Sequence, residues 1–160
     1  MYDILPADLN RPDHARDFVT LLDEYARDPM GGGQPLPEAV KRDLPGALAR
    51  RPGVHVLLAY VDGAPAGLAN CMEGFSTFAC KPLLNVHDFM VSAPFRGQGV
   101  ARRLLAEVER RARALGCCKI TLEVLQGNAP AQALYRSEGY DGYQLDARAG
   151  HALFWQKKLD

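Results

Sequence analysis

The stretch from His87 to Leu105, HDFMVSAPFRGQGVARRLL, places an apolar strand, a turn with two glycines and the start of an amphipathic helix in direct succession. Glycine has no Cβ, so successive backbone N–H groups in the turn Arg96-Gly97-Gln98-Gly99 can converge on one point. These donors stand beside the positive end of the helix dipole, where anions bind. The stretch therefore predicts a pyrophosphate site, and a connection that needs glycine only for its geometry is the alternative.

Two other phosphate-binding motifs do not fit this turn. The Rossmann spacing needs a third small residue where Arg102 stands. A P-loop needs a lysine directly after its last glycine, and Gly99 is followed by Val100. Arg96 before the turn, together with Arg102 and Arg103 after it, would add positive charge to the predicted site.

A second motif lies downstream, from Leu122 to Tyr140, and reads LEVLQGNAPAQALYRSEGY. The two motifs together resemble those of the GNAT acetyltransferase superfamily. The first, Arg/Gln-x-x-Gly-x-Gly/Ala, is matched by Arg96, Gly99 and Ala101. The second, Leu-Glu-Val followed by Asn-x-x-Ala-x-x-Leu-Tyr-x-x-x-Gly-Phe/Tyr, is matched by Asn128, Ala131, Leu134, Tyr135, Gly139 and Tyr140. The likeness is close from Asn85 to Tyr140.

The resemblance implies that acetyl-CoA lies between two parallel strands that splay apart after Val91 and Val124. Backbone groups of the first strand would meet the pantetheine, at Phe89, Met90 and Val91. The turn and the first helical residues would hold the pyrophosphate, at Arg96, Gly97, Gln98, Gly99, Val100, Ala101 and Arg102. Asn128 would bind the coenzyme at the mouth of the last helix, and a helix cap or turn former is its alternative role.

Acetyl transfer to an amine also needs a base, because a primary amine with a pKa near 10 is mostly protonated at neutral pH. The resemblance puts Glu123 forward, with Asp88 on the opposite strand as its rival and a water relay as a further possibility. It also implies that Tyr135 serves the departing CoA sulfur. Full proton transfer from a phenol to that thiolate is uphill by roughly 2 kcal/mol, so we expect Tyr135 to stabilise the thiolate through a hydrogen bond. A backbone N–H on the Val91 strand would hold the oxyanion.

Periodicity along the chain predicts one α/β (α+β) domain over residues 1–160, with a mostly antiparallel central sheet, a splayed parallel strand pair and about four helices. The expected strands are 2–5, 55–61, 65–72, 83–91, 119–125, one near Tyr143 and 152–158. The expected helices are 13–27 capped by Asp13, 37–50 with a break at Pro45, 100–115 and 129–138. Asp62-Gly63 predicts a tight hairpin. The resemblance implies that 28–37 and 73–84 are loops of the acceptor site.

Composition limits the classes of partner. The 19 basic and 19 acidic residues give zero net charge, which argues against a nucleic acid or an anionic membrane. No apolar stretch approaches the roughly 20 residues of a membrane span, and the first residues do not resemble a secretory signal. Four cysteines, Cys71, Cys80, Cys117 and Cys118, lack metal-type spacing. We expect them to be packing thiols of a reduced, cytoplasmic protein, and we expect no metal site.

Four acidic residues of the expected acceptor region could attract a cationic amine or belong to a solvated helix face: Asp23, Glu24, Asp28 and Glu73. The leading hypothesis is direct acetyl transfer from acetyl-CoA to a primary amine of a small molecule or a protein. A non-catalytic acyl-CoA-binding sensor or scaffold of the same fold is the alternative. Homodimers are common in families of this kind, so a homodimer is also expected.

Overall fold

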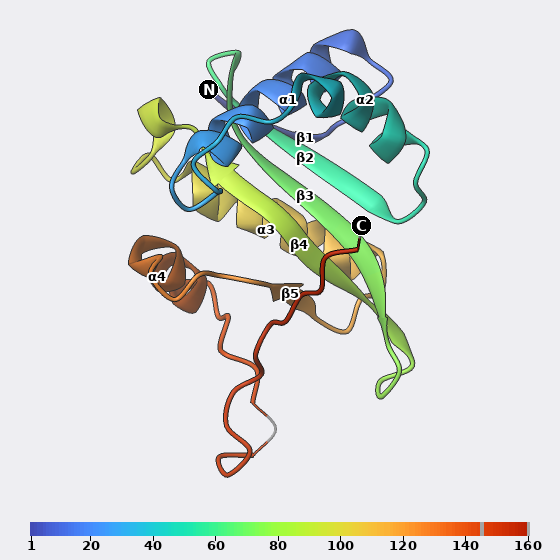
Figure 1. Cartoon of the computed structure of the whole chain (residues 1–160), viewed down its shortest axis with the longest axis vertical. Helices are drawn as coiled ribbons and strands as arrows, with labels where there is room; N and C mark the ends of the chain where they lie inside the picture. The colour runs from blue at the N-terminus through green and yellow to red at the C-terminus, as the bar shows by residue number, and fades with distance from the viewer. Residues whose placement is uncertain (145, 160) are drawn as a thin grey trace. The chain divides into compact units, whose positions relative to one another are not determined.

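A mixed sheet organises the amino-terminal part of the protein in a computed structural model that describes residues 1–144 and 146–159 (Figure 1). Contacts divide the chain into two compact units, Met1–Leu122 and Glu123–Asp160, and each is described by itself. The strands of the first unit follow the order β1-β2-β3-β4-β5. They are β1 (Tyr2–Pro6), β2 (Val54–Val61), β3 (Ala64–Ser76), β4 (Lys81–Val91) and β5 (Ile120–Leu122). The first four pair in antiparallel fashion and β4 pairs with β5 in parallel, which confirms the predicted fold class.

Helices cover both faces of this sheet (Figure 1). On one face lie α1 (Pro12–Arg27) and α2 (Glu38–Ala49), and on the other lies α3 (Val100–Ala114), which follows a 3₁₀ turn at Ala93–Phe95. Successive side chains of a strand point to opposite faces of the sheet, so neighbouring residues pack in two different cores, one against α3 and one against α1. Leu57 packs with α3 residues such as Leu104, whereas Leu58 packs with α1 residues such as Phe18.

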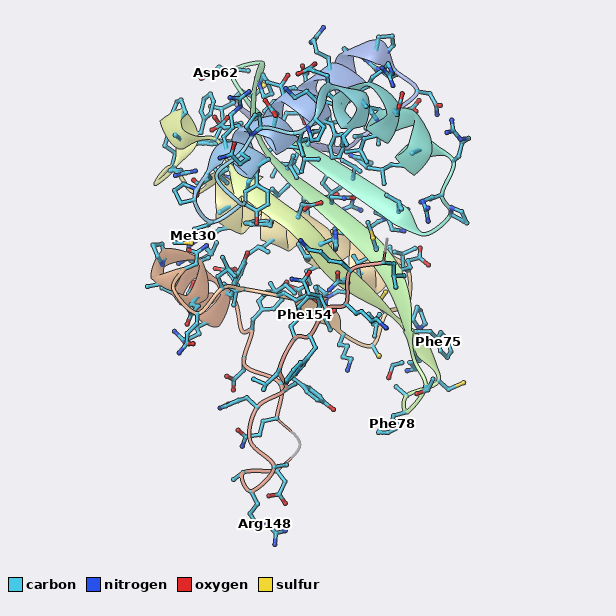
Figure 2. All side chains as sticks on the ribbon, viewed as in Figure 1. Met30, Asp62, Phe75, Phe78, Arg148 and Phe154 are labelled. Carbon is cyan, nitrogen blue, oxygen red and sulfur yellow. The ribbon has the colours of Figure 1, made fainter. Side chains whose placement is uncertain are left out.

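Several local expectations were wrong. Asp13 does not cap α1, because the helix is entered from Arg11 and the Asp13 carboxylate instead accepts a hydrogen bond of 2.7 Å from the Arg11 guanidinium. Pro45 does not break α2, which continues to Ala49. The long loop expected over 73–84 is a β-hairpin in which β3 runs to Ser76 and β4 begins at Lys81. Its tip carries Phe78, which is 97% exposed (Figure 2).

The second unit contains the helix α4 (Ala129–Ser137). The strand expected over 119–125 is limited to Ile120–Leu122 at the end of the first unit. Residues 152–158 form no strand, and the nearest pairing in the second unit is one isolated antiparallel bridge, Gln144 to His151. Among the helices of residues 1–144 and 146–159, none is long and apolar enough to cross a membrane.

Candidate functional site

The turn before α3 adopts the backbone conformation that its two glycines permit. Gly97 has φ +75° and Gly99 has φ +80°, both in the left-handed region that side chains disfavour. Space is open where a Cβ would stand at either position. Gly99 is the N-cap of α3 and, having no side chain, offers no capping group of its own to the first amides of the helix. A diphosphate fits this site because the helix start is electropositive, the backbone N–H groups can donate hydrogen bonds, and the space beside both glycines is open.

Tyr2 supports this turn from the amino-terminal strand, and the sequence reading missed it. Its hydroxyl donates a hydrogen bond of 3.0 Å to the backbone oxygen of Gln98. Its ring lies under the guanidinium of Arg103, 4.5 Å from the ring centroid. Because Tyr2 and the turn are nearly a hundred residues apart in the chain, only the pairing of β1 into the sheet brings them together. No local pattern in the sequence signals such a contact.

Arg96 joins α1 to the end of β4. Its Nε donates to the backbone oxygen of Val91 at 3.0 Å, and its Nη2 lies 3.2 Å from Oδ2 of Asp28. Hydrogen bonds from the backbone N–H of Met30 and from Arg96 lower the pKa of Asp28. Beside this pair, Oε1 of Glu24 accepts a hydrogen bond of 3.0 Å from the backbone N–H of Ala93. The Arg96 side chain thus links the start of the turn to the end of β4 and to Asp28. A contact of Arg96 with a phosphate stays a prediction.

The parallel pairing of β4 stops well before the strand does. The last register pair with β5 joins Val86 to Leu122, and β4 continues to Val91. This early end of the ladder is what the predicted splay requires on the β4 side. Side chains of Phe89 and Val91 pack against the α3 core, and Met90 is buried in the α1 core. Only their backbone groups are therefore candidates for the pantetheine.

A β-bulge sets the direction of Asp88. Across β3 and β4, Asn70 is opposite Asp88 while Cys71 is opposite Val86, so His87 is an extra residue in β4. The bulge reverses the alternation, so that Val86 packs in the α3 core but Met90 in the α1 core. Asp88 shares the face of Met90 and accepts a hydrogen bond of 2.9 Å from Nδ2 of Asn70. Asp88 is among the site residues predicted from the sequence, and Asn70 is not.

In the second unit, Asn128 caps α4. Its Oδ1 accepts a hydrogen bond of 3.2 Å from the backbone N–H of Ala131, the geometry of an N-cap. The alternative role considered for Asn128 is thus confirmed, and coenzyme binding by it stays a prediction. Tyr135 is buried, with its ring centroid 5.8 Å from that of Tyr140. Glu123 is the first residue of this unit and is exposed.

All four acidic residues proposed to attract an amine already have partners. Asp23 pairs with Arg27 at 3.0 Å and with Lys41 at 3.3 Å, and Oε1 of Glu73 lies 2.5 Å from Nε2 of His55. Asp28 and Glu24 hold Arg96 and the Ala93 amide as described. These residues tie elements of the fold together, whereas Asp88 is paired only with a neutral amide among the described residues.

The cysteines and histidines form no metal cluster within residues 1–144 and 146–159. Cys71 is buried as expected, but Cys80 and Cys118 are exposed, so the prediction that all are packing thiols was wrong. His14 is buried and its Nδ1 accepts a hydrogen bond of 3.0 Å from the backbone N–H of Asp8. It therefore has a structural role at the start of α1.

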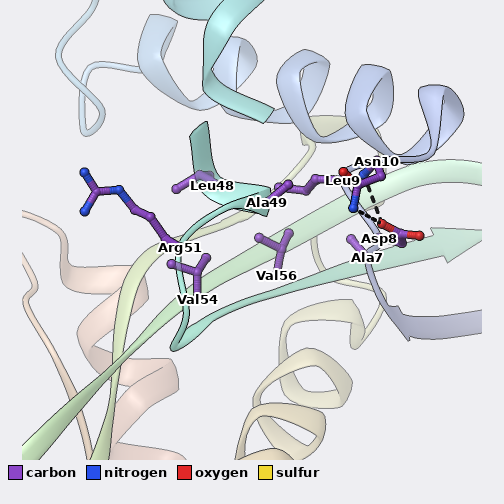
Figure 3. A pocket seen from close by; sticks show the side chains of 9 residues that line it. All are labelled: Ala7, Asp8, Leu9, Asn10, Leu48, Ala49, Arg51, Val54 and Val56. Atoms are coloured by element: carbon purple, nitrogen blue, oxygen red, sulfur yellow. Dashed lines mark hydrogen bonds between the residues drawn. The ribbon is translucent and has the colours of Figure 1, made fainter. Parts of the chain in front are cut away.

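A cavity of about 150 Å³ lies beside the segment that follows β1 (Figure 3). It is bounded by the segment after β1, the end of α2 and the start of β2, with Ala7, Asp8, Leu9, Asn10, Leu48, Ala49, Arg51, Val54 and Val56 around it. Oδ1 of Asp8 accepts hydrogen bonds from the backbone and side chain of Asn10 at 3.0 Å each. None of the predicted site residues lines this cavity.

Known proteins resemble the chain in sequence and in fold. Residues 18–140 match the model of the Acetyltransferase (GNAT) family. A thialysine N-epsilon-acetyltransferase of Caenorhabditis elegans is 26% identical over 149 residues, 86% of this chain and 89% of that protein. The enzyme of the same name from Sus scrofa is 30% identical over 135 residues, 72% of this chain and 76% of that protein.

Solved structures show the same fold. A probable acetyltransferase superposes with a TM-score of 0.80 at 23% identity, covering 98% of this chain and 99% of that one. An aminoglycoside N-acetyltransferase in complex with CoA superposes with a TM-score of 0.75 at 19% identity, covering 99% of this chain and 96% of that one. The glycine turn, the mixed sheet and these matches agree: the chain belongs to the acetyltransferase (GNAT) family and is an N-acetyltransferase.

Proposed function

We propose that the protein transfers an acetyl group directly from acetyl-CoA to a primary amine of a small molecule, and that residues 1–160 act as one N-acetyltransferase domain. The geometry of the turn at Gly97 and Gly99 is the observation that carries this proposal. Open space beside both glycines and an uncapped helix start suit the diphosphate of the coenzyme. The family as a whole uses the same coenzyme.

The choice of a small-molecule amine draws on the names of the relatives. Both curated relatives cited above are thialysine N-epsilon-acetyltransferases, which act on an amino group at the end of an amino-acid side chain. The CoA complex with the same fold is an aminoglycoside N-acetyltransferase. An acceptor of this kind is a flexible or multiply charged amine. Under the proposal, it approaches from the face of β4 that carries Asp88.

Coenzyme contacts are assigned to the residues that match the family motifs. Backbone groups of β4 take the pantetheine, at Phe89, Met90 and Val91. Amides of the turn and of the first turn of α3 take the diphosphate, at Gly97, Gln98, Gly99, Val100 and Ala101, with Arg102 adding charge beside them. Arg96 keeps the turn in place through Val91 and Asp28.

The chemical step needs a group that accepts a proton from the amine and a hydrogen-bond donor at the CoA sulfur. The amine nitrogen forms the new C–N bond while the C–S bond of the thioester breaks, so one amine proton must leave and the thiolate must be stabilised. We assign stabilisation of the thiolate to the Tyr135 hydroxyl. Asp88 and Glu123 are both assigned to the acceptor side, either directly or through water.

The experiment combines coenzyme binding with turnover. Acetyl-CoA should raise the melting temperature of the purified protein, and thiol release should appear with members of an amine panel that includes thialysine and lysine. Tyr135→Phe should lower kcat by at least 10-fold with little change in acetyl-CoA affinity. Tyr143→Phe, in the same unit, is the matched control and should retain full activity.

Two results would contradict the proposal in different ways. Stabilisation by acetyl-CoA without thiol release from any amine would favour the non-catalytic acyl-CoA-binding module. Absence of both stabilisation and turnover would overturn coenzyme use altogether.

A further inference from the structure

We propose that Asn70 is a positioning residue that holds Asp88 in place to receive the protonated amine of the acceptor. This inference rests on the proposed acetyl transfer and adds a residue that neither family motif contains. It also narrows the acceptor to amines that arrive as ammonium ions. Three observations in the first unit support it: the burial of Asn70, the charges around Asp88 and the bulge at His87.

Asn70 occupies a buried position of β3, where an apolar side chain would give a higher free energy of unfolding. Its side chain is 3% exposed, on the same face of β3 as Leu68 in the α1 core. Nδ2 donates to Asp88 at 2.9 Å, while Oδ1 is buried and has no hydrogen-bond partner in the part of the chain that the structure describes. A buried carbonyl without a partner is destabilising, so the amide is oriented to serve the carboxylate at the expense of its own oxygen.

Asp88 has a negative charge that no cation in the described residues neutralises. Its charge contributes, after burial, to a raised pKa of two residues: Tyr25 on α1, and Cys71, which follows Asn70 on β3 and packs in the α3 core. Asp28, the acidic residue that directly follows α1, is already paired with Arg96 at 3.2 Å. An ammonium ion would therefore be the first cation to reach Asp88, and the free-energy cost of leaving a half-buried charge unpaired favours that pairing.

The β-bulge in β4 brings Asp88 opposite Asn70. His87 is the extra residue, and it turns Asp88 to the α1 face directly opposite Asn70. Because Nδ2 fixes Oδ2 of Asp88, the carboxylate cannot rotate freely, and Oδ1 is left for the acceptor. The ammonium then gives one proton to the carboxylate or through it to water, and the neutral amine attacks the thioester carbonyl. The C–N bond forms, the C–S bond breaks, and the second amine proton leaves with the CoA thiol.

The test compares Asn70→Leu with Asn85→Leu in the full chain. Asn85 is a matched control, because it is a half-buried amide on β4 that donates to Oγ1 of Thr121 at 3.1 Å. For Asn70→Leu we expect kcat/KM with a cationic amine to fall by at least 10-fold. The acid limb of its pH profile should move to higher pH, because the hydrogen bond from Asn70 favours the charged carboxylate. Acetyl-CoA affinity should stay within 2-fold, and Asn85→Leu should leave the acid limb in place.

A double-mutant cycle with Asp88→Asn completes the test. If Asn70 acts through Asp88, then Asn70→Leu should cost little further activity once Asp88 is changed. Asn70→Ser, which keeps a smaller donor, should fold and show an intermediate loss if the leucine variant does not fold. Normal kcat/KM and an unmoved acid limb in the Asn70 variants of an active enzyme would overturn the role of Asn70 alone. A wild-type protein that turns over no amine would overturn the proposed function, and this inference with it.

Discussion

The surroundings of Cys71 lower the reactivity of its thiol. Burial, followed by the charge of Asp88, raises the pKa of Cys71 from an ordinary 9.0 to about 12. At pH 8 the reactive thiolate is therefore about 1000-fold scarcer than for an exposed cysteine. We expect iodoacetamide to modify Cys80 and Cys118 in the native protein and Cys71 only in denaturant, as measured by peptide mass spectrometry. Equal labelling rates for all three would contradict the burial of Cys71.

The same residues show what a sequence can say about single side chains. Cys71 lies in the interior of an apolar run, and its burial was predictable. Cys80 occupies a turn with φ +49° at the tip of a hairpin that the sequence reading replaced by a loop, so its exposure was missed. Asn70 was missed for a related reason: a polar residue in an apolar strand has meaning only once its partner across the sheet is known.

At the scale of elements, the turn into α3 contains two glycines at positive φ, Gly97 and Gly99. Gly97→Ala and Gly99→Ala each force a side chain into a left-handed conformation, which costs about 1–2 kcal/mol. We expect a lower melting temperature and a weaker acetyl-CoA affinity, measured by calorimetric titration. Gly63→Ala is the control, because Gly63 has φ +80° in the β2–β3 hairpin and also has open space around it. It should show a similar loss of stability with unchanged coenzyme binding, and a loss of affinity there too would argue against a specific role of the turn.

The contact between β1 and this turn gives a milder prediction. Tyr2→Phe keeps the ring under Arg103 but removes the hydrogen bond to the Gln98 oxygen. A hydrogen bond of this kind contributes about 1 kcal/mol, so acetyl-CoA should bind about 5-fold more weakly. Tyr2→Leu should weaken binding further because it also removes the cation–π contact. Unchanged affinity in both variants would show that the turn holds its shape without β1.

Elements were predictable where local chemistry decides them. The period of 3.6 in α1 and α3, and the Asp62-Gly63 turn, were correctly placed by pattern alone. Pro45 was taken as a break, but the helix α2 continues through it because only one backbone donor is lost there. The expected strand over 152–158 fails because alternation of apolar residues creates a strand only where a neighbouring edge accepts it.

At the scale of the whole molecule, the proposed coenzyme contacts fall in both units. If both serve one acetyl-CoA, hydrogen exchange should slow on its addition in 96–101 of the first unit and in 128–137 of the second. Protection of the first segment alone would remove Asn128 and Tyr135 from the coenzyme site. Protein without acetyl-CoA, and protein with adenosine, are the controls for this measurement. The homodimer stays a prediction that no observation of the chain tests.

The single inserted residue in β4 has a consequence for comparisons of related chains. Deleting His87 would remove the bulge and make Val86 and Asp88 direct neighbours, which a regular strand also turns to opposite faces, so the residues from Asp88 onward would keep their present faces. A chain with one residue fewer at this position could therefore offer the same carboxylate, whereas a chain that kept His87 but paired without the bulge would turn Asp88 to the other face. A difference in length of one residue at this point is therefore compatible with the same arrangement of side chains, provided that the bulge is gained or lost with it.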